Sequence, residues 1–107
     1  MIFYEEVRIL TKKIGFKEAK RRAIEALRDK TYEVETRREI ETKNLLYSNA
    51  VSEEEIIDVI SKCRGQDHEM RPHHMVKTVD VHILRKEDWY IKFYFLDPNT
   101  IFISVHR

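Results

Sequence analysis

The chain has 107 residues, 42% of them hydrophobic, and its 20 basic and 19 acidic side chains leave a formal net charge of +1. This length suits one domain with one core, and the near-neutral charge excludes a protein that binds nucleic acid through bulk positive charge. No apolar run approaches the roughly 20 residues of a membrane span, and the first residues lack the pattern of a signal peptide. Because the single cysteine, Cys63, cannot form an internal disulfide, we expect a cytoplasmic protein with no membrane partner.

The first half of the chain shows the periodicity of helices. Apolar residues spaced four, three and four apart predict a helix over 3–14 that ends at Gly15. A second helix is expected over 17–30, with its small and aliphatic residues toward the core. Its basic side chains are interleaved with carboxylates, so this surface is either solvated or in contact with an RNA backbone.

Two capping boxes mark further helices. After a short predicted strand over 32–35, a hydroxyl and a carboxylate three residues apart predict the start of a helix over 37–47. Ser52 and Glu55 repeat this pattern and predict another helix, which ends at the next glycine. Cys63 continues the apolar face of that helix, so we interpret it as a small core residue.

Three histidines lie in the segment 66–75, which we interpret as a loop because Pro72 disfavours helix there. His68, His73 and His74 could join a carboxylate as zinc ligands. Their spacing matches no zinc signature, however, and the chain has no CxxC or HExxH motif. We therefore expect no metal and no cofactor, and we expect His73 to contribute little because no strand holds it.

The last third of the chain has the alternation of three strands, over 76–84, 89–96 and 101–106. One face is apolar and is the expected core: Val79, Val81, Ile83, Ile91, Phe93, Phe95, Ile101, Ile103 and Val105. The other face comprises Thr78, Asp80, His82, Tyr90, Lys92, Tyr94, Phe102, Ser104 and His106. Together with the helical first half, this pattern predicts an α+β fold in which N-terminal helices pack on a C-terminal twisted antiparallel β-sheet.

If the three strands place their apolar residues on the same face, core-facing residues of neighbouring strands lie opposite one another. The polar residues then also lie opposite one another and form one patch. This register places His82 and His106 each opposite Tyr90 or Lys92, and Asp80 near Lys92 or Tyr94. Imidazoles, phenols, a lysine and a carboxylate on one surface can transfer protons or bind a phosphodiester. The alternative is that these are ordinary polar residues on an exposed sheet face.

The helical segment 24–60 and three short motifs in the predicted strands occur in a recognisable order. The motifs are VDV at 79–81, WYIK at 89–92 and ISVH at 103–106. In this order they resemble the MqsR-type (motility quorum-sensing regulator) toxins, which are messenger-RNA endonucleases with a RelE-like fold. The resemblance covers roughly residues 24–106. It implies an endoribonuclease toxin with an antitoxin protein as partner, and RNA products that end in a 2′,3′-cyclic phosphate.

By motif position, the resemblance also implies roles for single residues. Tyr90 corresponds to the family's functional tyrosine, His106 stands where a lysine of the last strand is usual, and His68 lies near a loop lysine. Val79 stands in place of the family's active-site glutamine.

An RNase that uses no metal needs a base for the 2′-hydroxyl, an acid for the leaving 5′-oxygen, and cations for the phosphate. We expect His106 to serve as acid or base together with His68 or His82. The expected catalytic residues are His106, Tyr90, His68, His82 and Lys92. The expected RNA-binding residues are Arg107, Tyr94, Arg71 and Lys77.

Two other functions stay open. Asp80 and Lys92 could form the site of a metal-dependent nuclease, although Tyr90 occupies the position where an acidic ligand is wanted. The aromatic sheet face could instead belong to a non-catalytic module that binds nucleic acid or protein. RNA and an antitoxin are the expected partners, and a homodimer is an open alternative.

Overall fold

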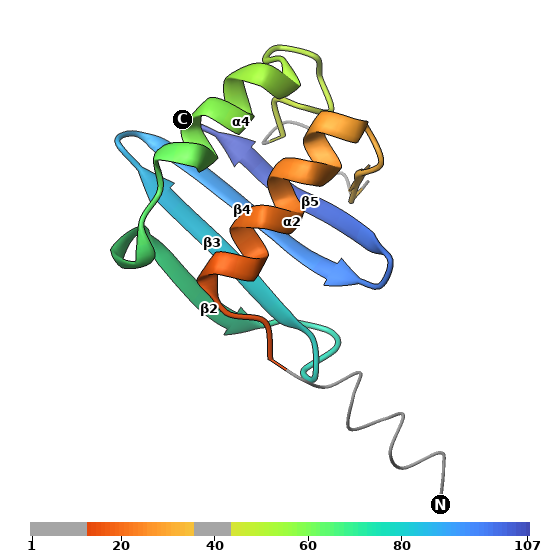
Figure 1. Cartoon of the computed structure of the whole chain (residues 1–107). Helices are drawn as coiled ribbons and strands as arrows, with labels where there is room; N and C mark the ends of the chain where they lie inside the picture. Colours follow the sequence, from red (N-terminus) through yellow and green to blue (C-terminus); the bar gives the residue numbers. More distant parts are fainter. Residues whose placement is uncertain (1–12, 36–43) are drawn as a thin grey trace, which may run out of the picture.

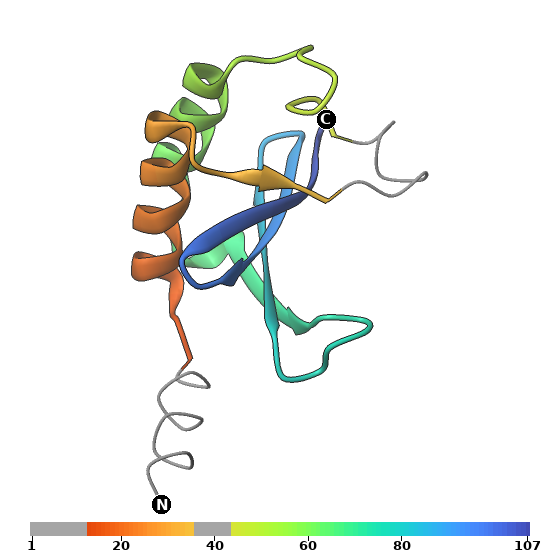
Figure 2. The same cartoon turned by 90° about the vertical axis from the view of Figure 1, so that its right-hand side faces the viewer.

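The computed structural model describes residues 13–35 and 44–107. These residues form the helices α2 (Phe16–Asp29) and α4 (Glu53–Lys62) and one short 3₁₀ helix, η1 (Gly65–Asp67). The strands are β1 (Glu33–Val34), β2 (His68–Pro72), β3 (Asp80–Lys86), β4 (Trp89–Leu96) and β5 (Asn99–His106). They form one sheet in the order β1-β5-β4-β3-β2, and both α-helices lie on the same face of it (Figure 1; Figure 2).

The predicted α+β class is confirmed, but the sheet is mixed. β1 runs parallel to β5, with Glu33 opposite Ile101, whereas the other neighbouring strands are antiparallel. A parallel pair needs a crossover connection, and the chain between β1 and β5 includes α4 and the other three strands. The prediction of a wholly antiparallel sheet is therefore wrong at this edge.

Both described α-helices begin and end close to their predicted limits. α2 begins after Gly15 and ends at Asp29, because the left-handed backbone of the next residue, Lys30 (φ 56°), stops the helical hydrogen-bond pattern. The Ser52 side chain accepts the amide of Glu55, and the Glu55 carboxylate accepts the amide of Ser52. The predicted capping box at α4 is thus confirmed. The first predicted helix lies outside the described residues except for 13 and 14.

The helix predicted over 37–47 is wrong in the part that the structure describes, since residues from Asn44 onward form a β-bridge and turns. Asn44 is fully buried and bridges Val105 of β5. Its side chain donates to the carbonyl oxygen of Phe102 and accepts the amides of Leu46 and Tyr47. A buried amide that satisfies distant backbone groups holds this segment against the sheet edge. Residues 37–43 lie outside the described residues.

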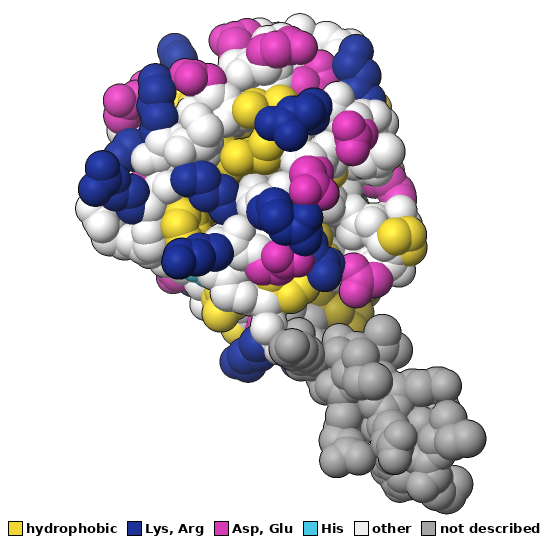
Figure 3. All heavy atoms as spheres, in the orientation of Figure 1, with side chains coloured by type: hydrophobic (Ala, Val, Ile, Leu, Met, Phe, Trp, Pro, Cys, Tyr) yellow, Lys and Arg dark blue, Asp and Glu magenta, His cyan; other side chains and the backbone are white. Residues whose placement is uncertain are grey.

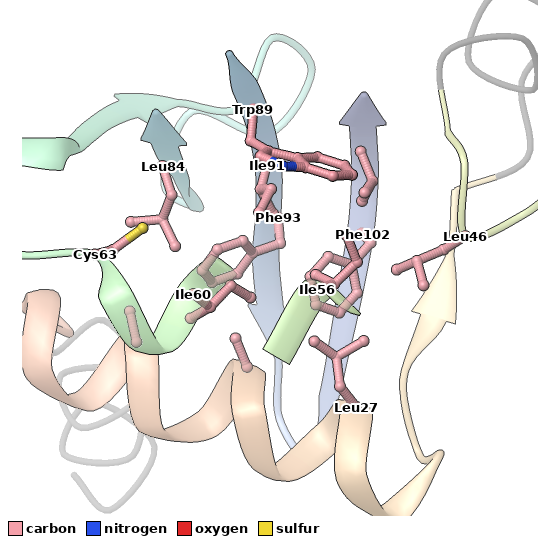
Figure 4. Packing of buried hydrophobic residues seen from close by; sticks show 13 residues of the cluster. Leu27, Leu46, Ile56, Ile60, Cys63, Leu84, Trp89, Ile91, Phe93 and Phe102 are labelled. Atoms are coloured by element: carbon pink, nitrogen blue, oxygen red, sulfur yellow. The ribbon is translucent and has the colours of Figure 1, made fainter. Parts of the chain in front are cut away.

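The main core lies between the two helices and the sheet (Figure 4). Its buried members are Ala19, Ala23, Leu27, Leu46, Ile56, Ile60, Cys63, Leu84, Trp89, Ile91, Phe93, Phe102 and Val105. Cys63 is almost fully buried, which confirms it as a core residue, and burial raises the pKa of its thiol. Lys20 ties the helices together because its ammonium donates to the carbonyl oxygens of Ser61 and Cys63.

The outer surface of the helices carries basic and acidic side chains side by side (Figure 3). Arg21 donates to Glu18 and Glu25, and Arg22 donates to Glu18 and Asp97. Hydrogen bonds from Arg21 and then Arg22 lower the pKa of Glu18 to about 2. Such exposed pairs are typical of a solvated surface and contribute little to stability. Neither described α-helix has the length and apolar character needed to cross a membrane.

The segment interpreted as a loop contains a strand. β2 pairs antiparallel with β3, from His68 opposite Leu84 to Pro72 opposite Asp80. Pro72 is tolerated because it is the last residue of a strand at the sheet edge, where its missing N–H interrupts no central ladder.

The predicted register between the strands of the β3–β4 hairpin is wrong by one residue. A two-residue turn pairs Lys86 with Trp89, so His82 lies opposite Phe93 rather than opposite Tyr90 or Lys92. The sequence pattern is ambiguous here because four consecutive residues, 81–84, are buried. When both faces of a strand are covered, alternation does not tell which face belongs to the core.

A β-bulge in β5 decides the faces of the last hairpin. Near its turn, Phe102 lies opposite Phe93 in the main core, which corrects its assignment to the polar face. Beyond a shift of register at Lys92 and Phe93, His106 lies opposite Tyr90, as predicted. Ile101 and Ile103 leave the main core and join a second apolar cluster on the other face: Val81, Ile83, Tyr94, Ile101 and Ile103.

Candidate functional site

The candidate site lies on the sheet face that α2 and α4 do not cover, which we call the open face. Three cross-strand rows of residues from β3, β4 and β5 define it. The first row is Arg85, Tyr90 and His106; the second is Ile83, Lys92 and Ser104; the third is Val81, Tyr94 and Ile101. Tyr90, Lys92 and Tyr94 alternate along β4 with the core residues, so the predicted faces of this strand are confirmed.

Tyr90 lies between a cation and an imidazole. The His106 ring stacks on it with centroids 5.2 Å apart, and the Arg85 guanidinium lies 5.2 Å from its centroid. Since Arg85 comes from β3 and His106 from β5, they approach the Tyr90 ring from opposite sides. Tyr90 therefore has no free ring face on which an RNA base could stack, and the group it offers to a ligand is its hydroxyl.

The first row extends toward β2 through an ion-paired carboxylate. Glu69 accepts a hydrogen bond from Arg85 and another from Arg71, the latter at 2.6 Å. These hydrogen bonds, first that of Arg85 and then that of Arg71, lower the pKa of Glu69. Two guanidinium groups thus share one carboxylate on the open face, which leaves this end of the sheet cationic.

Lys92 lies in the second row, beside the row of Tyr90 and His106. It is partly buried, and no carboxylate of the described residues pairs with it. An ammonium group in this position can bind an anion such as a phosphate.

Two of the predicted catalytic histidines lie on the opposite face, under α2. The Nε2 atom of His68 and the Nδ1 atom of His82 are 2.9 Å apart, and His82 stacks on Phe93. Only 1% of His82 is exposed, and desolvation, followed by the nearby His68, lowers its pKa to about 4. Burial also lowers the pKa of His68. The sheet separates this pair from His106, so the expectation that His82 lies in one patch with Tyr90, Lys92 and His106 is wrong.

The remaining predicted site residues are divided between the two faces. Asp80 lies two residues before His82 in β3 and therefore on the same, helix-covered face of the sheet. Lys92 lies on the other face, so the pairing expected for a metal-dependent nuclease is not formed. The Arg107 guanidinium lies 4.5 Å from the ring centroid of Trp89, a main-core residue, rather than beside Lys92. Lys77 is exposed in the loop between β2 and β3.

A cluster that the sequence analysis missed lies next to Tyr94 on the open face. The Tyr94 hydroxyl donates to the Oε2 atom of Glu35, at 2.9 Å, and the Nε2 atom of His73 is 3.9 Å from the same oxygen. His73 also packs edge-on against Tyr94 and stacks with His74. Glu35 follows β1 and His73 follows β2, the two opposite edges of the sheet, so these flanking segments meet over the open face.

His73 is firmly held, which corrects the expectation of a loosely held loop residue. It is 7% exposed, and its Nδ1 atom accepts the amides of Met75 and Val76 at 3.1 and 3.2 Å. No spacing in the sequence could reveal this cluster, because its members come from three segments that only the sheet brings together.

The histidines of segment 66–75 also do not converge as metal ligands. His68 faces the main core, whereas His73 and His74 lie over the open face. Within residues 13–35 and 44–107, no group of three or more His, Cys, Asp and Glu side chains has the arrangement of a metal site.

A comparison of the chain with protein-family models, with curated proteins and with solved structures finds no match.

Proposed function

We propose that this protein is an endoribonuclease that cleaves RNA by attack of the 2′-hydroxyl, with the open face as its active site and no metal in the reaction. The observation that carries the proposal is the cross-strand pair of Tyr90 and His106 beside the ammonium of Lys92 in the neighbouring row. These groups combine a proton donor and acceptor, a hydroxyl and a cation on one accessible surface.

The roles follow from the chemistry of each side chain. His106 transfers a proton, because an imidazole can be charged or neutral near pH 7. Lys92 binds the phosphate and stabilises the additional negative charge of the transition state, with Arg85 nearby. Tyr90 hydrogen-bonds to the phosphate or ribose through its hydroxyl, because its ring is already flanked on both sides.

The resemblance to MqsR-type toxins supports the same proposal. On that basis we propose a RelE-like fold, a role as the toxin of a toxin–antitoxin pair, and an antitoxin protein as partner. The mixed five-stranded sheet carries both α-helices on one face, and Tyr90, Lys92 and His106 lie on the face that these helices do not cover.

A cleavage assay tests the proposal. Purified protein is incubated with a 5′-labelled messenger RNA in excess EDTA, and the product ends are identified. We expect cleavage to persist and to leave a 2′,3′-cyclic phosphate and a 5′-hydroxyl. His106→Ala should cut about 10²-fold more slowly, the usual scale for loss of one proton-transfer group, while its thermal unfolding matches that of the wild type.

Other outcomes point to the alternatives. Loss of cleavage in EDTA with recovery on adding Mg²⁺ would favour a metal-dependent nuclease. RNA binding without any cleavage would favour the non-catalytic binding module, and equal cleavage by His106→Ala and wild type would remove His106 from the chemistry.

A further inference from the structure

We propose that this protein forms a weak homodimer through antiparallel pairing of strand β2 (His68–Pro72) with β2 of a second copy; this inference does not depend on the proposed ribonuclease function. β2 is the outermost strand at one end of the sheet (Figure 1). An edge strand presents unpaired backbone donors and acceptors on its outer side. The last three residues of β2 are also exposed, so a second strand can reach this edge.

The hydrogen-bond pattern of β2 shows which backbone groups point outward. The His73 amide donates to the carbonyl oxygen of Val79 at 2.8 Å, and this pair continues the register of β2 with β3. Hydrogen-bonded and non-hydrogen-bonded pairs alternate along an antiparallel ladder. The backbones of Glu69 and Arg71 therefore bond to β3, whereas the amide and carbonyl of Met70 point away from the sheet.

Two further observations agree with this pattern. Pro72 falls where an N–H would point outward, which is the position that a sheet edge tolerates for proline. The β3–β4 hairpin closes with Lys86 opposite Trp89, so His82 bonds to β4 and leaves Met70, which lies opposite it in β2, without a bond to β3. In the part of the chain that the structure describes, the backbone groups of Met70 thus have no partner.

The charges of β2 identify a second copy as the partner and fix the register. In an antiparallel pair centred on Met70, Glu69 of each copy lies opposite Arg71 of the other, and opposite charges in this position stabilise a pair of strands. A pair centred on Glu69 or on Arg71 instead places two like charges opposite each other, which is destabilising. The segment is therefore complementary to itself in one register.

The contacts in this register are few, so the dimer is weak. The Met70 amide of each copy donates to the Met70 carbonyl of the other, and the two Met70 side chains, each 38% exposed, come together. The ladder extends no further, because Pro72 has no N–H and the His68 amide already donates to the carbonyl oxygen of Gly65. With two backbone hydrogen bonds and two exposed ion pairs, we expect a dissociation constant on the order of 0.1 to 1 mM.

Charge reversal tests the register. Sedimentation of the full chain at up to about 1 mM should show a reversible dimer. Arg71→Glu and Glu69→Arg each place like charges across the interface, so each variant alone should dimerise roughly tenfold more weakly. An equimolar mixture of the two variants should dimerise as the wild type does, because opposite charges then face each other. Lys62→Glu makes the same change of charge on α4, far from β2 in sequence, and is the matched control.

The backbone contribution is tested with two variants of Met70. Met70→Pro removes the amide donor of both intermolecular hydrogen bonds, which the fold itself does not use, so thermal unfolding should stay close to that of the wild type while the dimer is lost. Met70→Leu keeps the amide and an apolar side chain and should still dimerise. In NMR spectra of the wild type, the Met70 amide should shift as the protein concentration rises.

Each result supports or overturns the proposal. A wild type that stays monomeric up to about 1 mM overturns it. A dimer that persists in both charge variants, or in Met70→Pro, uses another surface and also overturns it. If the wild type dimerises but the mixture of charge variants does not, the proposed register is wrong. RNA cleavage is measured separately, and its presence or absence leaves these conclusions unchanged.

Discussion

At the scale of single residues, the packing of Tyr90 separates the effect of its hydroxyl from that of its ring. Arg85 and His106 flank the ring, so Tyr90→Phe preserves the stack and removes only the oxygen. We expect this variant to unfold at the wild-type temperature and to cleave RNA about 10²-fold more slowly. Parallel thermal melts and single-turnover rates check this. An unchanged rate would show that the hydroxyl takes no part in the reaction.

A second prediction at this scale concerns the charge of Lys92 and the salt dependence of RNA binding. Lys92→Ala should weaken RNA binding and make it less dependent on salt, because one fewer phosphate is neutralised; the slope of log affinity against log salt should fall by about 0.7 for single-stranded RNA. Lys62→Ala is the matched control, since Lys62 is exposed on α4 and pairs with Asp58. Affinity measured between low and moderate salt gives both slopes. Equal slopes in the two variants would place the RNA elsewhere.

At the scale of elements, the packing of β3 against its neighbours β2 and β4 on the covered face should weaken in acid. The pKa of His82 falls from 6.5 to about 4 in the folded protein, so the unfolded chain binds a proton more readily. The stabilisation is therefore complete above about pH 6.5 and is lost as the pH falls toward 4, with a total of about 3 kcal/mol. Urea unfolding between pH 7 and pH 4.5 measures this loss, to which the lowered pKa of His68 adds.

His82→Gln is the control for this effect, because an amide cannot be protonated in this range and can still hydrogen-bond to His68. We expect its unfolding free energy to depend much less on pH than that of the wild type. The same pH dependence in both proteins would assign the acid sensitivity to other groups.

At the scale of the whole molecule, one sheet carries apolar clusters on both faces. Leu27 is fully buried in the main core, and Ile83 is 1% exposed in the open-face cluster. We expect Leu27→Ala and Ile83→Ala each to lower the unfolding free energy by about 2 to 5 kcal/mol. Both variants should show one urea transition, with Trp89 fluorescence and far-UV circular dichroism coinciding. Separate midpoints would mean that the two faces unfold independently.

Much of the local structure could be predicted because its causes lie close together in the chain. The capping box of Ser52 and Glu55 and the periodicity of α2 depend on neighbours within one or two turns. The alternation of β4 identified its two faces, since one face packs under the helices and the other carries Tyr90, Lys92 and Tyr94. These residues of the candidate site were accordingly predicted together with His106.

The sequence by itself therefore determined the fold class, both described helices, the extents of β4 and most of β5, and the placement of Tyr90, Lys92 and His106 on one surface. Only the tertiary structure decided which face each residue of β3 occupies, because a two-residue turn sets the register and both faces are buried. It also decided the cluster of Glu35, His73 and Tyr94. These three residues come from segments that follow β1 and β2 and from β4, and they meet because of the strand pairing. The sequence does not reveal this, because pairing between distant segments leaves no periodic pattern in it.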